Sequence, residues 1–332
     1  MTVRLKDVAK KAQISTSIAS HILNDNYKIK LNPETRRRVK EVAKKLGYTP
    51  NAVARGLRLK KTETIGLLIP NVMTSFYNEI IRGIEMTANE ENYVVLVGCS
   101  AFNTDKEKMY LASMLNRGVD GILISSFKGS NIELLKKINN EVPLVFVDSF
   151  IEGVVADYVV TDNLKGAYIG TKELIRAGAT KICYVGHVGV SVLQDRFNGF
   201  VKALNDYKIE FSKDLFMLDC EEYLLGKLIS QKKIDSIFIS ADYIMPLLRV
   251  LRKYNLAIPA DIKVATFDEP FFNTETQEDI DVLKIVKEPM PYIQQPKLEM
   301  GKKACEILIE KIKTGIYKHT ISKILMEPKL KI

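Results

Sequence analysis

The spacing of apolar residues along the chain changes near residue 61. Before that point, apolar residues recur every three or four positions, as on amphipathic helices. A first helix is predicted over Leu5–Ala12, and a second begins at Ser15, whose hydroxyl can accept a hydrogen bond from a free N–H of the first turn. A third begins at Asn32–Glu34, which supplies an N-cap, a proline at the first helical position and a negative charge, and it ends at Gly47.

The second predicted helix has two unlike faces. Its apolar residues between Ile18 and Leu23 share one face and can pack on the first helix. The opposite face carries small polar side chains and one imidazole, namely Thr16, Ser17, Ser20 and His21. A helix-turn-helix module presents such a face to the DNA major groove, but an ordinary helical hairpin would show the same pattern. This stretch alone therefore leaves both interpretations open.

The segment that follows, residues 49–61, predicts a helix of only two turns. It opens at Asn51, just after a proline, and contains a glycine, so it is marginal alone and forms only when something holds it. Small residues such as Ala54 allow close approach to DNA, and Leu57, near Arg55, has no core to enter. These features favour a hinge that folds in the minor groove and inserts Leu57 between base pairs, with a flexible linker as the alternative.

From Thr64 onward, short apolar runs alternate with amphipathic helices, which are predicted at 78–91, 106–117, 163–177 and 195–205. Repeated strand–helix units predict a parallel sheet with helices on both faces. The series is too long for one sheet, which indicates two similar lobes. The strands are predicted at 65–69, 94–97, 121–124, 144–147, 181–185, 236–239 and 263–267.

Ligands of such folds bind outside the carboxyl ends of the strands. A cleft between two lobes that faces these ends is therefore the expected small-molecule site. The ends that carry chemically useful side chains are Asn71–Tyr77, Cys99–Asn103, Ser125-Ser126, Asp148, His187, Ala241-Asp242 and Asp268.

Positive charge is concentrated in the helical head. Residues 1–61 hold 16 Lys and Arg against 4 Asp and Glu, whereas the whole chain has a net charge of +9, so the remainder is slightly acidic. A basic terminal module suits the phosphate backbone of nucleic acid, and its regular helical pattern argues against a mere solubilising tail. DNA binding is the favoured interpretation of the head.

Composition argues against several other classes of protein. The 332 residues are 46% hydrophobic and 27% charged, as in globular domains, and no apolar run approaches the roughly 20 residues that span a bilayer. Since no signal sequence is apparent, we expect a cytoplasmic protein that binds no membrane. The cysteines are isolated and the histidines lack ligand spacing, so no metal or other cofactor is expected. Phosphate loops and nucleophile elbows are missing too, and we expect no enzyme.

Motifs that occur in order along the whole chain resemble those of one known family. They are Asp7-Val8-Ala9, Ile14-Ser15, Ser20, Asn24, Tyr48-x-Pro50-Asn51-x-x-Ala54-Arg55-x-Leu57, Ile65–Pro70, Arg196-x-x-Gly199-Phe200, Ile258-Pro259, Phe267-Asp268 and Gln295-Pro296-x-x-Glu299-Met300-Gly301. The chain is thus similar to the lactose-repressor family of bacterial transcription regulators. Within that family it most resembles sugar-operon repressors and the catabolite control protein.

The resemblance implies an all-α helix-turn-helix head and an α/β effector domain of two lobes like those of periplasmic binding proteins. It places the DNA-binding head at residues 1–48, the hinge at 49–61 and the effector-binding and dimerisation domain at 62–332. The N-lobe is expected at about 62–161 and 294–321, and the C-lobe at about 162–293 and 322–332.

The resemblance also assigns roles to matching residues. Base readers correspond to Thr16, Ser17 and His21, with Ser20 on the same face, and the minor-groove segment contains Asn51, Ala54, Arg55 and Leu57. Effector anchors correspond to Phe76, Tyr77, Asp148, Arg196, Asp242 and Asp268. An aromatic of this set is expected to stack on a sugar face, and Arg196 and Asp268 to hold hydroxyls. The structural alternatives are core packing for the aromatics, an ion pair at a helix start for Arg196 and a loop cap for Asp268.

The expected protein is a homodimeric repressor of a carbohydrate-utilisation operon. It would bind double-stranded operator DNA with an affinity controlled by a sugar or sugar phosphate in the cleft. One alternative is a catabolite-control-type regulator whose co-effector is a phosphorylated carrier protein, and another is a sugar-binding transport receptor. The sequence departs from the family at Gln13, where Gly is usual and strain is expected, at His21, where Arg is common, and in residues 271–288, which are longer than usual.

Overall fold

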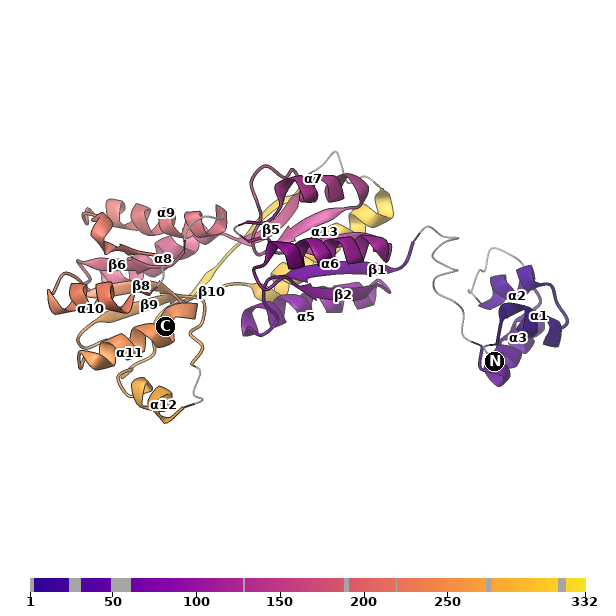
Figure 1. The fold of residues 1–332 in the computed structure, drawn as a ribbon, viewed down its shortest axis with the longest axis horizontal. Coiled ribbons are helices and arrows are strands. Elements are labelled where there is room, and N and C mark those ends of the chain that lie inside the picture. The colour runs from indigo at the N-terminus through magenta and orange to yellow at the C-terminus, as the bar shows by residue number, and fades with distance from the viewer. Residues whose placement is uncertain are drawn as a thin grey trace. The chain divides into compact units, whose positions relative to one another are not determined.

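The computed structural model describes residues 3–23, 31–48, 61–127, 129–187, 191–218, 220–272, 276–315 and 321–332. The chain divides into two compact units, Met1–Glu63 and Thr64–Ile332 (Figure 1). The predicted hinge residues Asn51, Ala54, Arg55 and Leu57 lie outside the described residues. Within the described part of the chain, no helix is long and apolar enough to cross a membrane.

The first unit, here called the head, contains α1 (Leu5–Lys11), α2 (Thr16–Leu23) and α3 (Pro33–Leu46). Local capping sets these bounds: Ser15 Oγ accepts a hydrogen bond from Ile18 N at 3.2 Å, and Asn32 Oδ1 accepts one from Glu34 N at 2.9 Å. Gly47 ends α3 with a left-handed φ of 68°. The buried core between the helices consists of Val8, Ala12, Ile22, Val39 and Ala43.

The turn between α1 and α2 carries the expected backbone strain. Gln13 has a φ of 53°, in the left-handed region that favours glycine. Its N–H donates to Lys10 O at 3.3 Å, and the N–H of Ile14 donates to Ala9 O at 3.1 Å. The turn is therefore closed by backbone hydrogen bonds despite the side chain at this position.

The first lobe of the second unit is built on a sheet of order β11-β5-β4-β3-β1-β2, in which each described pairing is parallel. Helices α5 and α13 pack on one face of this sheet, and α6 and α7 pack on the other. The elements are β1 (Thr64–Ile69), α5 (Ser75–Glu90), β2 (Val94–Cys99), α6 (Thr104–Asn116), β3 (Gly121–Ile124), α7 (Ile132–Glu141), β4 (Leu144–Val147), β5 (Asp157–Thr161), α13 (Lys297–Thr314) and β11 (Lys323–Met326).

The second lobe has a similar plan with the sheet order β12-β10-β9-β8-β6-β7, in which β12 pairs antiparallel with β10 and the other described pairings are parallel. Helices α8 and α9 cover one face, and α10 and α11 cover the other (Figure 1). The elements are α8 (Asn163–Arg176), β6 (Ile182–Val185), α9 (Ser191–Asp206), η1 (Lys213–Leu215), β7 (Phe216–Met217), α10 (Glu222–Ser230), β8 (Ser236–Ser240), η2 (Ala241–Tyr243), α11 (Ile244–Lys253), β9 (Lys263–Phe267), α12 (Gln277–Leu283), β10 (Tyr292–Gln294) and β12 (Lys329–Lys331).

The chain crosses between the lobes where β5 leads into α8, where β10 leads into α13 and where β11 leads into β12. The expectation that residues 322–332 all belong to the second lobe is wrong. Lys323–Met326 pair in parallel with β5 in the first sheet, and β12 joins the second sheet beside β10. The change of lobe happens within a few residues, and strands this short show no periodicity from which a boundary could be predicted.

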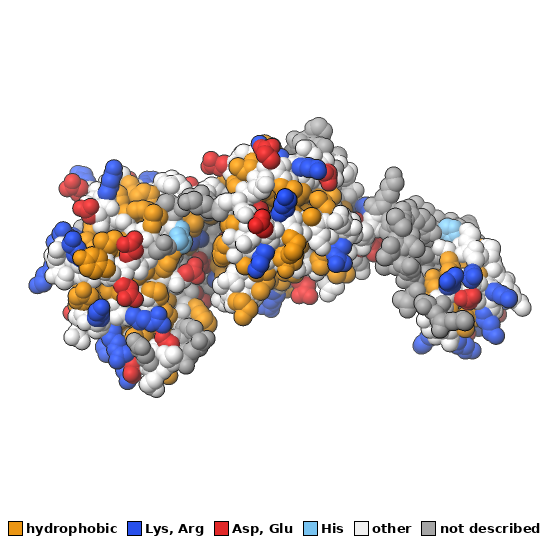
Figure 2. Space-filling view, in the orientation of Figure 1, with side chains coloured by type: hydrophobic (Ala, Val, Ile, Leu, Met, Phe, Trp, Pro, Cys, Tyr) orange, Lys and Arg blue, Asp and Glu red, His pale blue; other side chains and the backbone are white. Residues whose placement is uncertain are grey.

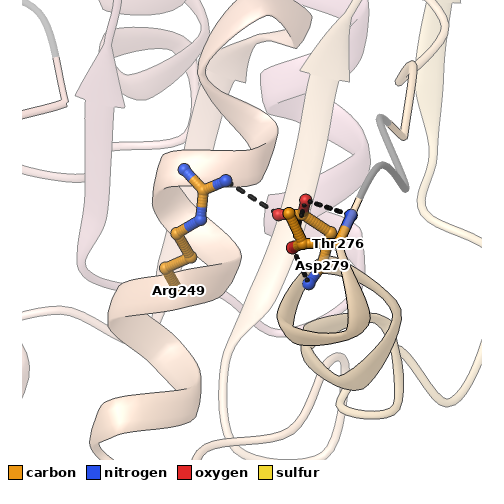
Figure 3. A network of polar contacts seen from close by, with 3 residues as sticks. All are labelled: Arg249, Thr276 and Asp279. Carbon is orange, nitrogen blue, oxygen red and sulfur yellow. Dashed lines mark hydrogen bonds and ion pairs between the residues drawn. The ribbon is translucent and has the colours of Figure 1, made fainter.

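The longer segment 271–288 contains the short helix α12. Thr276 and Asp279 form a reciprocal cap, in which Thr276 Oγ accepts from Asp279 N at 3.1 Å and Asp279 Oδ2 accepts from Thr276 N at 3.2 Å. Arg249 on α11 donates to Asp279 Oδ1 at 2.8 Å (Figure 3). Hydrogen bonds from Thr276 and Arg249 lower the pKa of Asp279, so the cap is ionised at neutral pH. This network fixes α12 to the second lobe.

Candidate DNA-binding face and effector cleft

The exposed side of α2 carries the predicted base readers. Thr16 and Ser17 are exposed, Ser20 and His21 are half-buried, and the intervening Ala19 is fully buried against the other helices. Figure 2 shows several Lys and Arg side chains on the head surface turned to the viewer. The arrangement offers short polar side chains on one helix for base edges, with cations around it for phosphates. The exposed cations of α3 include Arg37, Arg38, Lys44 and Lys45.

On the first lobe, polar side chains at the ends of β3 and β4 and at the start of α5 form one cluster. Tyr77 donates its hydroxyl proton to Asp148 Oδ2 at 3.0 Å, and Ser125 donates to the same oxygen at 3.2 Å. Ser125 Oγ also lies 3.1 Å from Ser149 Oγ. Asp148 has a left-handed φ of 70°, and its N–H donates to Val159 O at 3.0 Å. The backbone therefore turns sharply here and directs the carboxylate to the strand ends.

The ionisation of this cluster is perturbed. Burial raises the pKa of Asp148 to about 6, although the Arg196 charge and the Tyr77 hydrogen bond act to lower it. Burial and the neighbouring Asp148 carboxylate raise the pKa of Tyr77 well above its usual value, so the phenol stays a proton donor. The Tyr77 hydroxyl is thus already engaged within the protein. The expected stacking role on a sugar face stays a prediction for this residue.

On the second lobe, the cleft residues come from α9 and from the ends of β8 and β9. The guanidinium carbon of Arg196 lies 3.8 Å from the centroid of the Phe267 ring, and its Nε donates to Asn163 Oδ1 at 2.8 Å. Asp268 has a φ of 74°, and its N–H donates to Ile293 O at 3.0 Å. Stacking on the Phe267 ring fixes the orientation of the planar guanidinium, which suits it to paired hydrogen bonds with hydroxyl or carboxyl oxygens.

Two residues at a crossing also contact the cleft, and sequence reasoning missed both as site residues. Gln295 is 4% exposed, and its Nε2 donates to Asp268 Oδ2 at 2.7 Å. Lys297 Nζ lies 3.5 Å from Asp268 Oδ1 and 5.1 Å from the centroid of the Phe76 ring. Phe76 itself packs against the first-lobe core. The Gln-Pro pair was noted only as a family motif, because its partner lies 27 positions away.

Charges from both lobes act on one another at this cleft. Arg196 and Asp268 of the second lobe influence the ionisation of Asp148 in the first. Burial, followed by the Asp268 carboxylate, raises the pKa of Asp242, against Arg196, His187 and Lys297. The structure thus brings together the predicted anchors Tyr77, Asp148, Arg196, Asp242 and Asp268.

The side chains that the two lobes bring together are suited to binding a small polar molecule. Carboxylates accept hydrogen bonds from hydroxyl groups, and the guanidinium donates them. Asp268 Oδ1 is buried and accepts no hydrogen bond from any described residue, and its charged neighbour is Lys297 Nζ at 3.5 Å, so it has capacity to accept a further hydrogen bond. Within the described ranges, no group of three or more His, Cys, Asp or Glu side chains is placed to hold a metal ion.

A basic helical head with a polar face on α2, joined to two lobes with mostly parallel sheets, defines a DNA-binding regulator with a binding-protein-like body. Family comparison agrees. Residues 4–51 match the model for bacterial regulatory proteins of the lacI family, residues 65–251 match a periplasmic binding protein domain, and residues 171–332 match a periplasmic binding protein-like domain. The chain belongs to the lacI family of bacterial transcription regulators.

Curated relatives match nearly the whole chain. The transcriptional regulator RegA of Clostridium saccharobutylicum is 31% identical over 321 residues, which cover 93% of this chain and 92% of that protein. The ribose operon repressor of Haemophilus influenzae is 31% identical with the same coverage. The transcriptional repressor PurR of Aliivibrio salmonicida is 32% identical over 320 residues, with 93% and 92% coverage.

Solved structures share the fold. The lac repressor dimer bound to operator and an anti-inducer superposes with a TM-score of 0.81 at 19% identity, covering 100% of this chain and 98% of that one. The CelR regulator in complex with cellobiose gives a TM-score of 0.67 at 22% identity, with 99% and 98% coverage. At these identities the likeness establishes the architecture of both units.

Proposed function

We propose that this protein is a homodimeric operator-binding repressor, acting in the cytoplasm by binding and not by catalysis. Its DNA affinity is controlled by a small polyhydroxylated effector held between the lobes. The observation that carries the proposal is the meeting of Tyr77 and Asp148 from one lobe with Arg196 and Asp268 from the other, in a chain whose head has an exposed polar face on α2.

The chemistry of the cleft favours a sugar as the effector. Three carboxylates, on Asp148, Asp242 and Asp268, face two cations, on Arg196 and Lys297. Such a site accepts hydrogen bonds from several hydroxyls and donates hydrogen bonds to ring oxygens, as a sugar requires. Relatives named as a ribose operon repressor and a structural neighbour solved with cellobiose support this class.

A thermal-shift screen tests the effector. The purified chain is melted with D-ribose, D-glucose, cellobiose, lactose, ribose 5-phosphate and glucose 6-phosphate in turn. A bound sugar at 100 times its dissociation constant stabilises the native state by about 2.7 kcal/mol through mass action, which raises the melting temperature by several degrees. Arg196→Ala should abolish the shift, whereas Arg176→Ala, which removes an exposed arginine of α8, should keep it. An equal shift in both variants would remove Arg196 from the site.

The homodimer is supported by an apolar edge of the first lobe. Strand β2 is the outer strand of its sheet, and Val94 and Val97 on it are 67% and 41% exposed. An outer strand with exposed valines is a surface that pairs with another chain. Met86 on the adjacent α5 is also exposed. We place a dimer contact on this edge.

Sedimentation of the full chain tests the dimer. Val94→Glu puts a charge on the β2 edge and should yield a monomer at micromolar concentration. Val155→Glu changes an equally exposed valine in the loop before β5 and should leave the dimer intact. A dimeric Val94→Glu protein would move the contact elsewhere.

A further inference from the structure

A chain of buried hydrogen bonds links the cleft residues Arg196 and Asp268 through the crossings. Arg196 Nε donates to Asn163 Oδ1 at 2.8 Å, and Asn163 Nδ2 donates to Thr161 O at 2.8 Å. Thr161 Oγ donates to Gln295 Oε1 at 2.6 Å, and Gln295 Nε2 donates to Asp268 Oδ2 at 2.7 Å. We call these residues the crossing relay.

The relay joins the β5–α8 crossing to the β10–α13 crossing. Thr161 is the last residue of β5 and Asn163 the first of α8, while Gln295 lies between β10 and α13. Thr161 and Gln295 are separated by 134 positions in the chain, and the hydrogen bond between their side chains links the two crossings. A change in the angle between the lobes must therefore rotate both ends of this bond.

The two amides of the relay have no freedom to reverse. The Asp268 carboxylate only accepts, so Gln295 must face it with Nε2, which leaves Oε1 to accept from the Thr161 hydroxyl. Asn163 must accept from Arg196 with Oδ1, which leaves Nδ2 for Thr161 O. Thr161, Asn163 and Gln295 are 1%, 3% and 4% exposed, so an unmade bond leaves a buried polar group unpaired.

We propose that Thr161, Asn163 and Gln295 are positioning residues that tie the placement of the effector anchors Arg196 and Asp268 to the crossings between the lobes. An effector that pulls on either anchor then acts on both crossings at once. The inference rests on the proposed function for its link to an effector. The mechanical link itself holds with no ligand present, and it can be measured so.

Hydrogen exchange of the ligand-free full chain is the first arm of the test. Thr161→Val keeps the shape and removes the hydroxyl, whereas Thr161→Ser keeps the hydroxyl. Thr161→Val should speed amide exchange about tenfold in peptides covering 263–269 and 292–298, because local opening there becomes easier. Thr161→Ser should exchange like the wild type. Unchanged exchange at 292–298 in Thr161→Val would overturn the proposal.

A second pair of variants guards against a folding defect in the first. Gln295→Met removes both hydrogen bonds at similar volume, and Gln294→Met makes the same change one residue earlier, at a half-buried position. Gln295→Met should speed exchange at 158–164 in the other crossing, and Gln294→Met should not. Equal exchange in these two variants would show that the crossings are not coupled through Gln295.

Calorimetry with D-ribose and with cellobiose is the second arm. For a sugar that the wild type binds, Thr161→Val should weaken binding about tenfold, since Gln295, which holds Asp268, loses its bond to the other crossing, and Thr161→Ser should bind normally. Equal affinity in Thr161→Val and the wild type would contradict the positioning role. If the wild type binds no sugar of the panel, the proposed effector fails while the exchange arm still decides whether the relay couples the crossings.

Discussion

The two lobes place an aspartate at the same point of the same fold. Asp148 follows β4 and Asp268 follows β9, with φ of 70° and 74°. The N–H of each donates at 3.0 Å to a carbonyl of the next strand in its sheet, Val159 O for one and Ile293 O for the other. Backbone geometry at the cleft is therefore a property of the shared fold, not of either lobe's ligand contacts.

The partners of the two carboxylates differ. Asp148 is held by Tyr77 and Ser125 of its own lobe, whereas Asp268 is held by Gln295 and Lys297, which lie at a crossing. One anchor is thus a fixed part of a rigid lobe, and the other is attached to the element that changes when the lobes move. The same backbone geometry places both aspartates. The side chains around each aspartate decide whether it is linked to a crossing between the lobes.

The largest expected effect tests the shared scaffold. A Cβ on Gly199 of α9 would lie 2.0 Å from Leu164 O, and one on Gly301 of α13 would lie 2.2 Å from Ile80 O. Both contacts are with backbone of the neighbouring helix, so Gly199→Ala and Gly301→Ala should each cost about 3 kcal/mol of unfolding free energy in urea. Lys303→Ala on the exposed side of α13 should cost about 0.5 kcal/mol or less. A small loss of unfolding free energy for only one of the two glycine variants would show that the helix packing of the two lobes is not equivalent.

The next effect compares the two anchors directly. Asp148→Asn and Asp268→Asn should each weaken sugar binding by about 2 kcal/mol, roughly 30-fold, because each removes a charged acceptor. Only Asp268→Asn should also speed hydrogen exchange at 292–298, because only Asp268 contacts Gln295. If Asp148→Asn speeds hydrogen exchange at 292–298 as much as Asp268→Asn does, then Asp268 is not the only anchor linked to this crossing, and the proposed difference between the two aspartates is wrong.

A smaller effect follows from the ionisation of Asp148. Its pKa in the folded protein is about 6, above the ordinary 3.8, so the folded state binds more protons between these values. Stability should therefore fall as pH rises from about 4 to about 6, by about 1 kcal/mol after allowance for solvent screening. Asp148→Asn should flatten this part of the profile in urea unfolding. A difference between wild type and Asp148→Asn that does not change over this window would contradict the assignment.

The smallest expected effect concerns Gln13 of the head, which has a left-handed backbone conformation like that of Asp148 and Asp268. Gln13 has a φ of 53° and, unlike Asp148 and Asp268, occupies a turn of the head. Gln13→Gly should stabilise the head by about 0.5 kcal/mol, since relief of strain exceeds the added chain entropy. Slower hydrogen exchange of residues 8–22 in the full chain measures this, with Gln13→Ala as the unchanged control. Faster exchange in Gln13→Gly would show that the strain is absent.

Much of the head and of the sheets could be predicted from the sequence because their signals are local. Ser15, Asn32 and Gly47 mark helix ends by caps within three residues, and continuous apolar runs mark buried parallel strands. The strand ends likewise located Asp148 and Asp268. The lobe boundary near β11 was misplaced because that strand pairs with β5, far away in the chain.

The polar partners of the cleft could not be predicted in the same way. Thr161 and Gln295 meet across 134 positions, and nothing in the residues around either indicates the other. Ser125 was recognised as a strand end, but its bond to Asp148 depends on the register of β3 against β4. Sequence pattern finds the edge of the sheet where a site forms, while pairing of individual side chains requires the fold.

The most direct test of the whole account is a titration of operator DNA with the full chain at several salt concentrations. The DNA is a near-palindrome selected from a random library, and the titration is repeated with the sugar that raises the melting temperature. We predict a sequence-specific affinity that falls steeply with salt and changes at least about tenfold when the sugar is added. Binding without sequence preference, or an affinity that the sugar leaves unchanged, would contradict it.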